Sequence, residues 1–87
     1  MKLFREVVKD TTDQVLYFYS SGHFRIRIVM YMGDGEISCK VEIVNIQSLS
    51  QWTDLGWLYP NDIKGRKTKK AYVQRALELA IQFIDGE

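Results

Sequence analysis

The feature that most constrains the fold is a pair of alternating segments on either side of the tripeptide Gly-Asp-Gly. In residues 24–32 and 36–46, apolar side chains occupy nearly every second position, which is the period of a β-strand with one buried face. A two-residue Asp-Gly turn between them sets apolar residues opposite one another, with Ile28 facing Val41. A three-residue loop would place Ile28 opposite Lys40, which a sheet with one buried face does not tolerate. We therefore predict a β-hairpin with the two-residue turn.

Two further strands and one helix complete the predicted fold. Two segments nearer the amino terminus are rich in β-branched and aromatic side chains, and turn-forming residues separate them. Near the carboxyl terminus the apolar period changes to that of an amphipathic helix. We predict an α+β fold, in which an antiparallel meander of about four strands is covered on one face by a C-terminal helix. The predicted strands are residues 3–8, 14–19, 23–32 and 36–46, and the predicted helix is residues 67–85.

The turn before the central hairpin has two possible registers. A three-residue loop, Ser20 to Gly22, turns Tyr17 and Tyr19 toward the outer face of the sheet, with the glycine supplying the positive φ. A two-residue loop of Ser21 and Gly22 would turn both tyrosines inward. The first register is favoured because leucine and phenylalanine are buried at less polar cost than tyrosine. The sequence does not decide which face is buried.

Residues 48–56 are predicted to hold one helical turn. Ser48 and Gln51 have the spacing of a capping box, and Gly56 is a suitable stop. The following residues are predicted to be extended, because the residue before Pro60 avoids the helical region.

The length and composition of the chain are those of a single globular domain. Its 87 residues predict a single domain, residues 1–87, and 46% hydrophobic with 26% charged residues is typical of a globular protein. No apolar run approaches the roughly 20 residues that cross a bilayer, so no membrane association is expected. The amino-terminal residues lack the apolar core of a signal peptide, and a single cysteine rules out an internal disulfide. We expect a cytoplasmic location.

Positive charge gathers where the predicted helix begins. The chain has 12 basic and 11 acidic residues, and six of the basic ones lie between residues 64 and 75, where no acid occurs. The rest of the chain, with six basic and 11 acidic residues, carries −5. Cations at the amino end of a helix oppose its dipole, and a bound anion would reverse that unfavourable interaction. The alternative is a solvated basic loop that keeps the protein soluble.

These observations favour a nucleic-acid-binding protein, with single-stranded substrates preferred. Basic side chains would contact the phosphates, and aromatic side chains on the outer face of the sheet would stack with bases. Ordinary cross-strand Tyr–Arg packing and an ion pair between Arg27 and Glu42 are the alternative interpretation of the outer face. The predicted phosphate contacts are Lys64, Arg66, Lys67, Lys69 and Lys70. The predicted contacts on the outer face and beside the basic segment are Arg25, Arg27, Tyr17, Tyr19 and Trp57.

Catalytic chemistry finds little support in the sequence. His23 is the only histidine, and Cys39 falls among core positions, as a structural thiol does. No phosphate-binding loop of the Walker type and no set of zinc ligands occurs. We therefore predict a non-enzymatic protein without a metal or cofactor.

A protein-binding module is the alternative function. Tyrosine, tryptophan and arginine dominate the binding energy of protein interfaces, and a small adaptor or inhibitor that a phage or mobile element encodes would dock on a host protein in this way. A homodimer through an edge strand, residues 3–8 or 36–46, is also compatible with the sequence.

Overall fold

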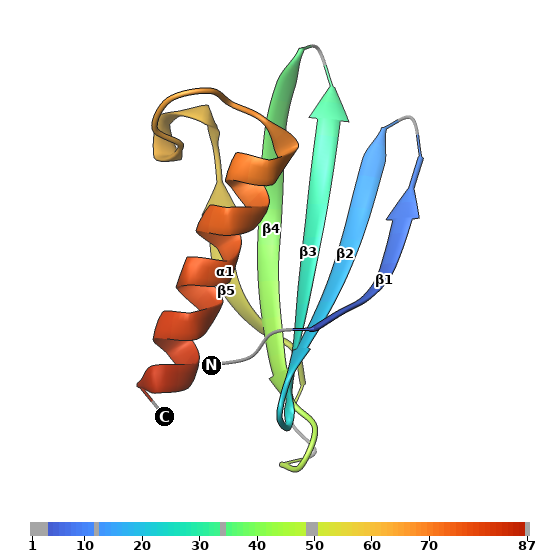
Figure 1. Cartoon of the computed structure of the whole chain (residues 1–87), viewed down its shortest axis with the longest axis vertical. Helices are drawn as coiled ribbons and strands as arrows, with labels where there is room; N and C mark the ends of the chain where they lie inside the picture. The colour runs from blue at the N-terminus through green and yellow to red at the C-terminus, as the bar shows by residue number, and fades with distance from the viewer. Residues whose placement is uncertain (1–3, 12, 34, 49–50, 87) are drawn as a thin grey trace.

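The computed structural model describes residues 4–11, 13–33, 35–48 and 51–86. One antiparallel sheet of five strands, in the order β1-β2-β3-β4-β5, is followed by a 3-10 helix and a long α-helix (Figure 1). The predicted α+β meander with a C-terminal helix is confirmed, with one strand more than expected. The elements are β1 (Phe4–Asp10), β2 (Gln14–Ser21), β3 (Phe24–Gly33), β4 (Glu36–Asn45), β5 (Thr53–Leu58), the 3-10 helix (Pro60–Asp62) and α1 (Lys69–Asp85).

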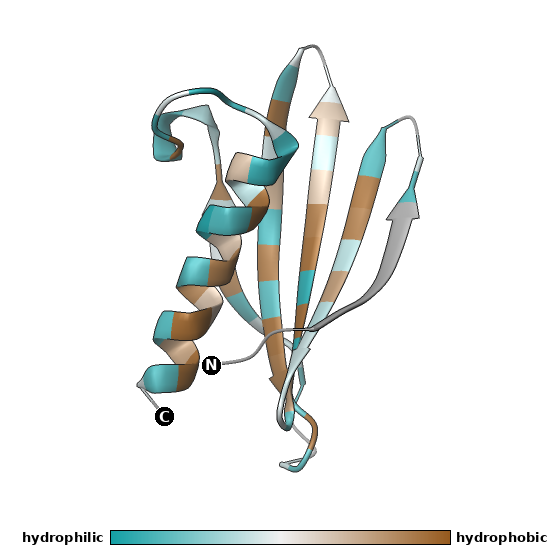
Figure 2. Cartoon of the chain, in the orientation of Figure 1, coloured by the Kyte–Doolittle hydropathy of each residue, from teal (hydrophilic) through white to brown (hydrophobic). Residues whose placement is uncertain are grey.

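Helix α1 packs on one face of the sheet, over β3, β4 and β5. Its apolar stripe faces the strands, while its outer side and the segment that precedes it are hydrophilic (Figure 2). Between the layers lies one hydrophobic core, to which the strands contribute alternate residues, as a pleated sheet requires. Among the described residues, the largest fully buried side chains of this core are Val15, Ile26, Ile28, Met30, Cys39, Val41, Ile43 and Tyr72.

The central hairpin has the predicted register. Ile28 pairs with Val41, and the ladder continues without a shift to Gly33 opposite Glu36. Gly35 has a φ of +79°, a conformation that glycine adopts at little steric cost. The other predicted turn residue, Asp34, lies outside the described residues. The alternation of apolar side chains therefore predicted the pairing of β3 with β4 correctly.

The predicted register of the preceding turn is wrong. Ser21 pairs with Phe24, so the turn consists of Gly22, with a φ of +59°, and His23. Tyr17 and Tyr19 consequently lie on the inner face, half-buried against the core, and not on the outer face. The polar cost of burying tyrosine did not keep Tyr17 and Tyr19 on the outer face, because α1 lies over β3, β4 and β5. Positions on β2 are only partly covered, and there an amphipathic tyrosine packs its ring while its hydroxyl reaches water.

The helical turn predicted for residues 48–56 is also wrong for residues 48 and 51–56, and residues 49 and 50 lie outside the described residues. A turn at residues 46–48 begins at Asn45, whose side-chain oxygen accepts a hydrogen bond from the Gln47 N–H at 2.9 Å. The chain then returns as β5 along β4, with Leu58 buried opposite Cys39. Pairing with β4 and burial of apolar side chains outweighed a local capping-box spacing, which stabilises a helix by only about 1 kcal/mol.

The additional strand changes which strands form the edges of the sheet. β4 is an interior strand, so the predicted edge at residues 36–46 is wrong, and the edges are β1 and β5. Both edge pairings contain an irregularity, between Arg5 and Val7 in one and between Val41 and Glu42 in the other. Bulges of this kind bend an edge strand and make it a poor template for a second chain. A dimer through an edge strand remains a prediction.

Helix α1 begins two residues later than predicted. Thr68 is its N-cap, and the Thr68 hydroxyl oxygen accepts a hydrogen bond from the Ala71 N–H at 3.2 Å. Lys67 therefore precedes the helix, whereas Lys69 and Lys70 occupy its first turn. Among the described residues, no helix has both the length and the apolar character needed to cross a bilayer.

Candidate nucleic-acid interface

The loop between β5 and α1 is held in place by its own backbone and by the core. The Asp62 carboxylate accepts a hydrogen bond from the Tyr59 N–H at 2.8 Å, and the Ile63 side chain is 6% exposed in the core. The Lys67 ammonium donates to the carbonyl oxygens of Ile63 at 2.7 Å and Gly65 at 3.3 Å. Lys67 thus connects two carbonyl groups of the same loop, and its ammonium group helps to stabilise the loop. This role was not predicted.

The other predicted phosphate contacts project from this loop and from the first turn of α1. All four side chains are exposed, and within the described part of the chain none makes a hydrogen bond or an ion pair. No acidic residue occupies the first turn of α1. The positive charge at the start of α1 is therefore not neutralised locally. We call this set the free cations: Lys64, Arg66, Lys69 and Lys70.

A shallow depression of about 460 Å³ lies between this loop and α1. Its lining carries both signs of charge, because Lys64 and Arg75 lie beside Asp62 and Glu78. The two acids already have partners: Glu78 pairs with Arg75 at 2.9 Å, and Asp62 accepts the backbone bond described above. Such a mixed lining does not select an anion. The free cations on the surface around the depression are the better candidates for phosphate contact.

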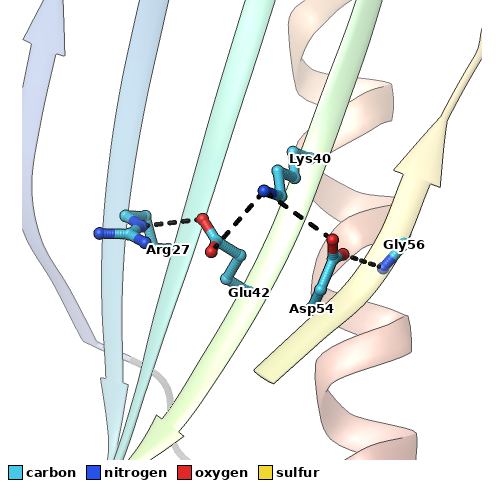
Figure 3. Close-up of polar contacts among 5 residues, drawn as sticks. All are labelled: Arg27, Lys40, Glu42, Asp54 and Gly56. Carbon is cyan, nitrogen blue, oxygen red and sulfur yellow. Dashed lines mark hydrogen bonds and ion pairs between the residues drawn. The ribbon is translucent and has the colours of Figure 1, made fainter. Parts of the chain in front are cut away.

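A chain of ion pairs crosses the face of the sheet opposite α1 (Figure 3). Arg27 lies 3.0 Å from Glu42, whose carboxylate is 4.0 Å from Lys40, and Lys40 is 3.8 Å from Asp54. The Asp54 carboxylate also accepts a hydrogen bond from the Gly56 N–H at 2.8 Å. The side chain of Glu42 is only 12% exposed, so this network connects β3, β4 and β5 within a partly desolvated layer.

The two arginines predicted on this face are occupied by contacts within the protein. Besides its ion pair, the Arg27 guanidinium lies 4.3 Å from the centre of the Trp52 ring, a cation–π contact. Arg25 donates hydrogen bonds to the carbonyl oxygens of Gly22 and Phe24. Both arginines lie on the first half of β3, at the end of the sheet opposite the free cations (Figure 1). The structure therefore does not bring them together with the basic loop.

Aromatic side chains gather at the same end as the free cations. Trp57, near the end of β5, stacks with Tyr31 at a centroid distance of 5.6 Å and with Tyr59 at 6.3 Å. The predicted Tyr17 and Tyr19 lie on the other face of the sheet and do not join this group. Tyr31 and Tyr59 were missing from the predicted contacts. The spacing of Trp57 and Tyr59 in an extended segment could have indicated a shared face, but the contact with Tyr31 required the pairing of β5.

Cysteine chemistry and metal binding have little support among the described residues. Cys39 is fully buried, and burial raises the pKa of its thiol from 9.0 to about 12, opposed by a hydrogen bond with the Leu58 backbone. A thiol that stays protonated is a poor nucleophile. Among the described residues, no group of three His, Cys, Asp or Glu side chains could hold a metal ion. The described residues therefore contain neither an activated thiol at Cys39 nor a three-ligand metal site.

The buried thiol makes stability depend on alkaline pH. In the unfolded chain the Cys39 thiol has a pKa of 9.0, whereas in the folded protein its pKa is about 12. Between these two pH values the unfolded state therefore binds fewer protons than the folded state. The free energy of unfolding should therefore fall above pH 9.0, by at most about 1.4 kcal/mol per pH unit from this group. Urea unfolding between about pH 7 and pH 10.5 measures the decline, which a Cys39→Ala variant should reduce. An equal decline in the variant would contradict the assignment.

No known protein family, no curated protein and no solved structure matches this chain.

Proposed function

We propose that this chain is a small, non-enzymatic nucleic-acid-binding protein that prefers single strands and contacts their phosphates with the free cations. The observation that carries the proposal is that Lys64, Arg66, Lys69 and Lys70 are exposed and have no partner in the described part of the chain. Cationic side chains that have no ion-pair partner within the protein can contact a phosphate backbone and release its condensed counterions, which drives binding. The formal net charge of +1 does not oppose it.

The position of the free cations on α1 supports the same conclusion. Lys69 and Lys70 lie in the first turn, where unsatisfied backbone N–H groups already carry partial positive charge. Each such lysine costs the helix a few tenths of a kcal/mol. A phosphate at this position would accept from N–H groups and ammonium groups together and would offset that cost.

The aromatic side chains at this end of the molecule favour a single strand. Stacking requires the flat face of a base, and in a duplex both faces are occupied by neighbouring base pairs. Tyr31 and Trp57 alternate with the buried Met30 and Leu58 and so lie on the sheet face that α1 leaves open, and Tyr59 stacks on Trp57 directly before the 3-10 helix that leads to the cationic loop. Phosphates and unpaired bases would therefore meet different parts of one surface.

Titration of labelled oligonucleotides with the full chain tests this proposal. Fluorescence anisotropy at about 20 mM salt should give micromolar or tighter binding to a single strand of mixed sequence and weaker binding to the matching duplex. The affinity should fall steeply toward physiological salt, because counterion release drives the association. Absence of binding at low salt, where screening is weakest, would exclude the proposal.

A protein-docking function is the second candidate. Among the side chains that the structure describes, the large apolar ones that remain exposed include residue types that dominate protein interfaces. They are Tyr31, Ile46, Trp57 and Tyr59. Three of them form the stacked group beside the basic loop, which would suit an acidic partner surface. A chain that binds no oligonucleotide at low salt but forms a defined complex with a protein would support this alternative.

A further inference from the structure

Three aromatic side chains from two non-adjacent strands form one stacked group on the open face of the sheet. Tyr31 lies on β3 and Trp57 on β5, and β4 runs between these strands. Opposite Tyr31 on β4 stands Ser38, and opposite Trp57 stands Lys40, so the two rings approach each other diagonally across this strand. Tyr59 follows Trp57 by two residues and extends the group toward the basic loop. The group therefore depends on the tertiary fold.

The rings in this group are nearly parallel and accessible to solvent. The planes of Tyr31 and Trp57 are inclined by 27°, and those of Trp57 and Tyr59 by 17°. Tyr31 is 39% exposed, Trp57 41% and Tyr59 53%, which is unusual for three large aromatic residues in contact. Nearly parallel rings that remain open to solvent offer planar surfaces to another planar group.

We propose that Tyr31, Trp57 and Tyr59 form the platform on which unpaired bases of a bound single strand stack. This inference rests on the proposed function. We infer the occupant from continuity along the chain, since Tyr59 directly precedes the 3-10 helix that leads to the loop with Lys64 and Arg66. A strand whose phosphates lie on these cations can then place its bases on the rings. Base stacking on aromatic rings tolerates any sequence, so the platform selects strandedness and not sequence.

The second tryptophan of the chain provides a matched comparison. Trp52 lies between β4 and β5, and the Arg27 guanidinium lies 4.3 Å above its ring. A cation already occupies this ring, which lies near the ion pairs of Figure 3 and at the end of the sheet away from the basic loop. Trp52 should therefore not contact a strand that is bound at the platform. Equivalent substitutions at Trp52 and Trp57 separate a loss at the platform from a general loss of tryptophan.

Affinity measurements on the full chain test the platform. A Trp57→Leu variant should bind a single strand about 10- to 100-fold more weakly than the unaltered protein, because stacking on one ring is lost. Its affinity for duplex and its dependence on salt should stay the same, since the cations remain. A Trp52→Leu variant should bind the single strand with unaltered affinity. Circular dichroism of both variants establishes that they are folded.

Fluorescence gives a second readout that does not depend on affinity. In a Trp52→Phe variant, Trp57 is the only indole, and a single strand should quench its emission to saturation at the concentrations that anisotropy gives. In a Trp57→Phe variant, the emission of Trp52 should not respond. Single-strand binding that the Trp57→Leu change leaves intact would overturn the platform while the proposed function stands. Failure of the unaltered chain to bind any oligonucleotide would overturn both.

Discussion

Replacing Tyr72 by alanine should lower the free energy of unfolding by about 3–5 kcal/mol, whereas replacing it by phenylalanine should raise it by about 1–2 kcal/mol. Tyr72 is the largest fully buried side chain and joins the first turns of α1 to the core. Its hydroxyl is buried and has no hydrogen-bond partner in the described part of the chain, and burial raises the pKa of the phenol. Alanine leaves a cavity, while phenylalanine keeps the packing and removes a desolvated polar group.

Urea unfolding of the two variants at neutral pH measures this difference. Tyr59→Phe is the matched control, because its side chain is 53% exposed and loss of a hydroxyl that water solvates should change little. A Tyr72→Phe variant less stable than the unaltered chain would mean that the hydroxyl has a partner and would contradict the prediction.

Replacing Lys64, Lys69 and Lys70 together by glutamine should weaken binding to a single strand on the order of 100-fold at about 50 mM salt. Each lost phosphate contact removes about 0.7 from the slope of log affinity against log salt, so the slope should become less steep by about 2. Lys67 is kept because its ammonium donates to Ile63 and Gly65 and supports the loop. Anisotropy titrations at several salt concentrations give both quantities.

A variant with the same change in net charge elsewhere is the control for this prediction. Gln47, Gln51 and Gln82 are exposed, and they lie after β4 and late in α1, at the opposite end of the molecule (Figure 1). Their replacement by glutamate also lowers the net charge by three but should leave most of the affinity and the slope intact. Equal losses in the two variants would mean that overall charge controls binding, and the free cations would not be the site.

The fold was predictable wherever a periodic pattern had one consistent solution. The hairpin of β3 and β4 has one register that places apolar residues such as Ile28 and Val41 opposite each other, and a shift by one residue would bury Lys40. The apolar stripe of α1 likewise has a single orientation, which buries Tyr72, Ala76 and Ala80 against the sheet. Local propensity and tertiary packing agree in both elements.

The predictions were wrong where packing against distant elements decides between two local structures. Whether Tyr17 turns inward depends on how far α1 reaches across the sheet, which no local pattern contains. Likewise, β5 carries a glycine with a φ of +115° next to a bulge, so its alternation is interrupted and a capping-box spacing was the stronger local signal. Pairing with β4, a long-range contact, resolved that ambiguity.

The candidate site was predictable in its charge but not in its geometry. Like charges clustered at the start of a helix are visible in the sequence, and Lys69 and Lys70 lie in the first turn as expected. That Lys67 supports the loop, and that Tyr31 meets Trp57 across β4, follows only from three-dimensional contacts.

The most direct test of the central claim is a heteronuclear NMR titration of the isotopically labelled chain with a short single strand at low salt. We predict that amide shifts concentrate in residues 64–70 and around Trp57, and that the indole N–H signal of Trp57 moves while that of Trp52 does not. Shifts confined to other surfaces, or no shifts at all, would contradict the assignment of this end of the molecule as a nucleic-acid interface.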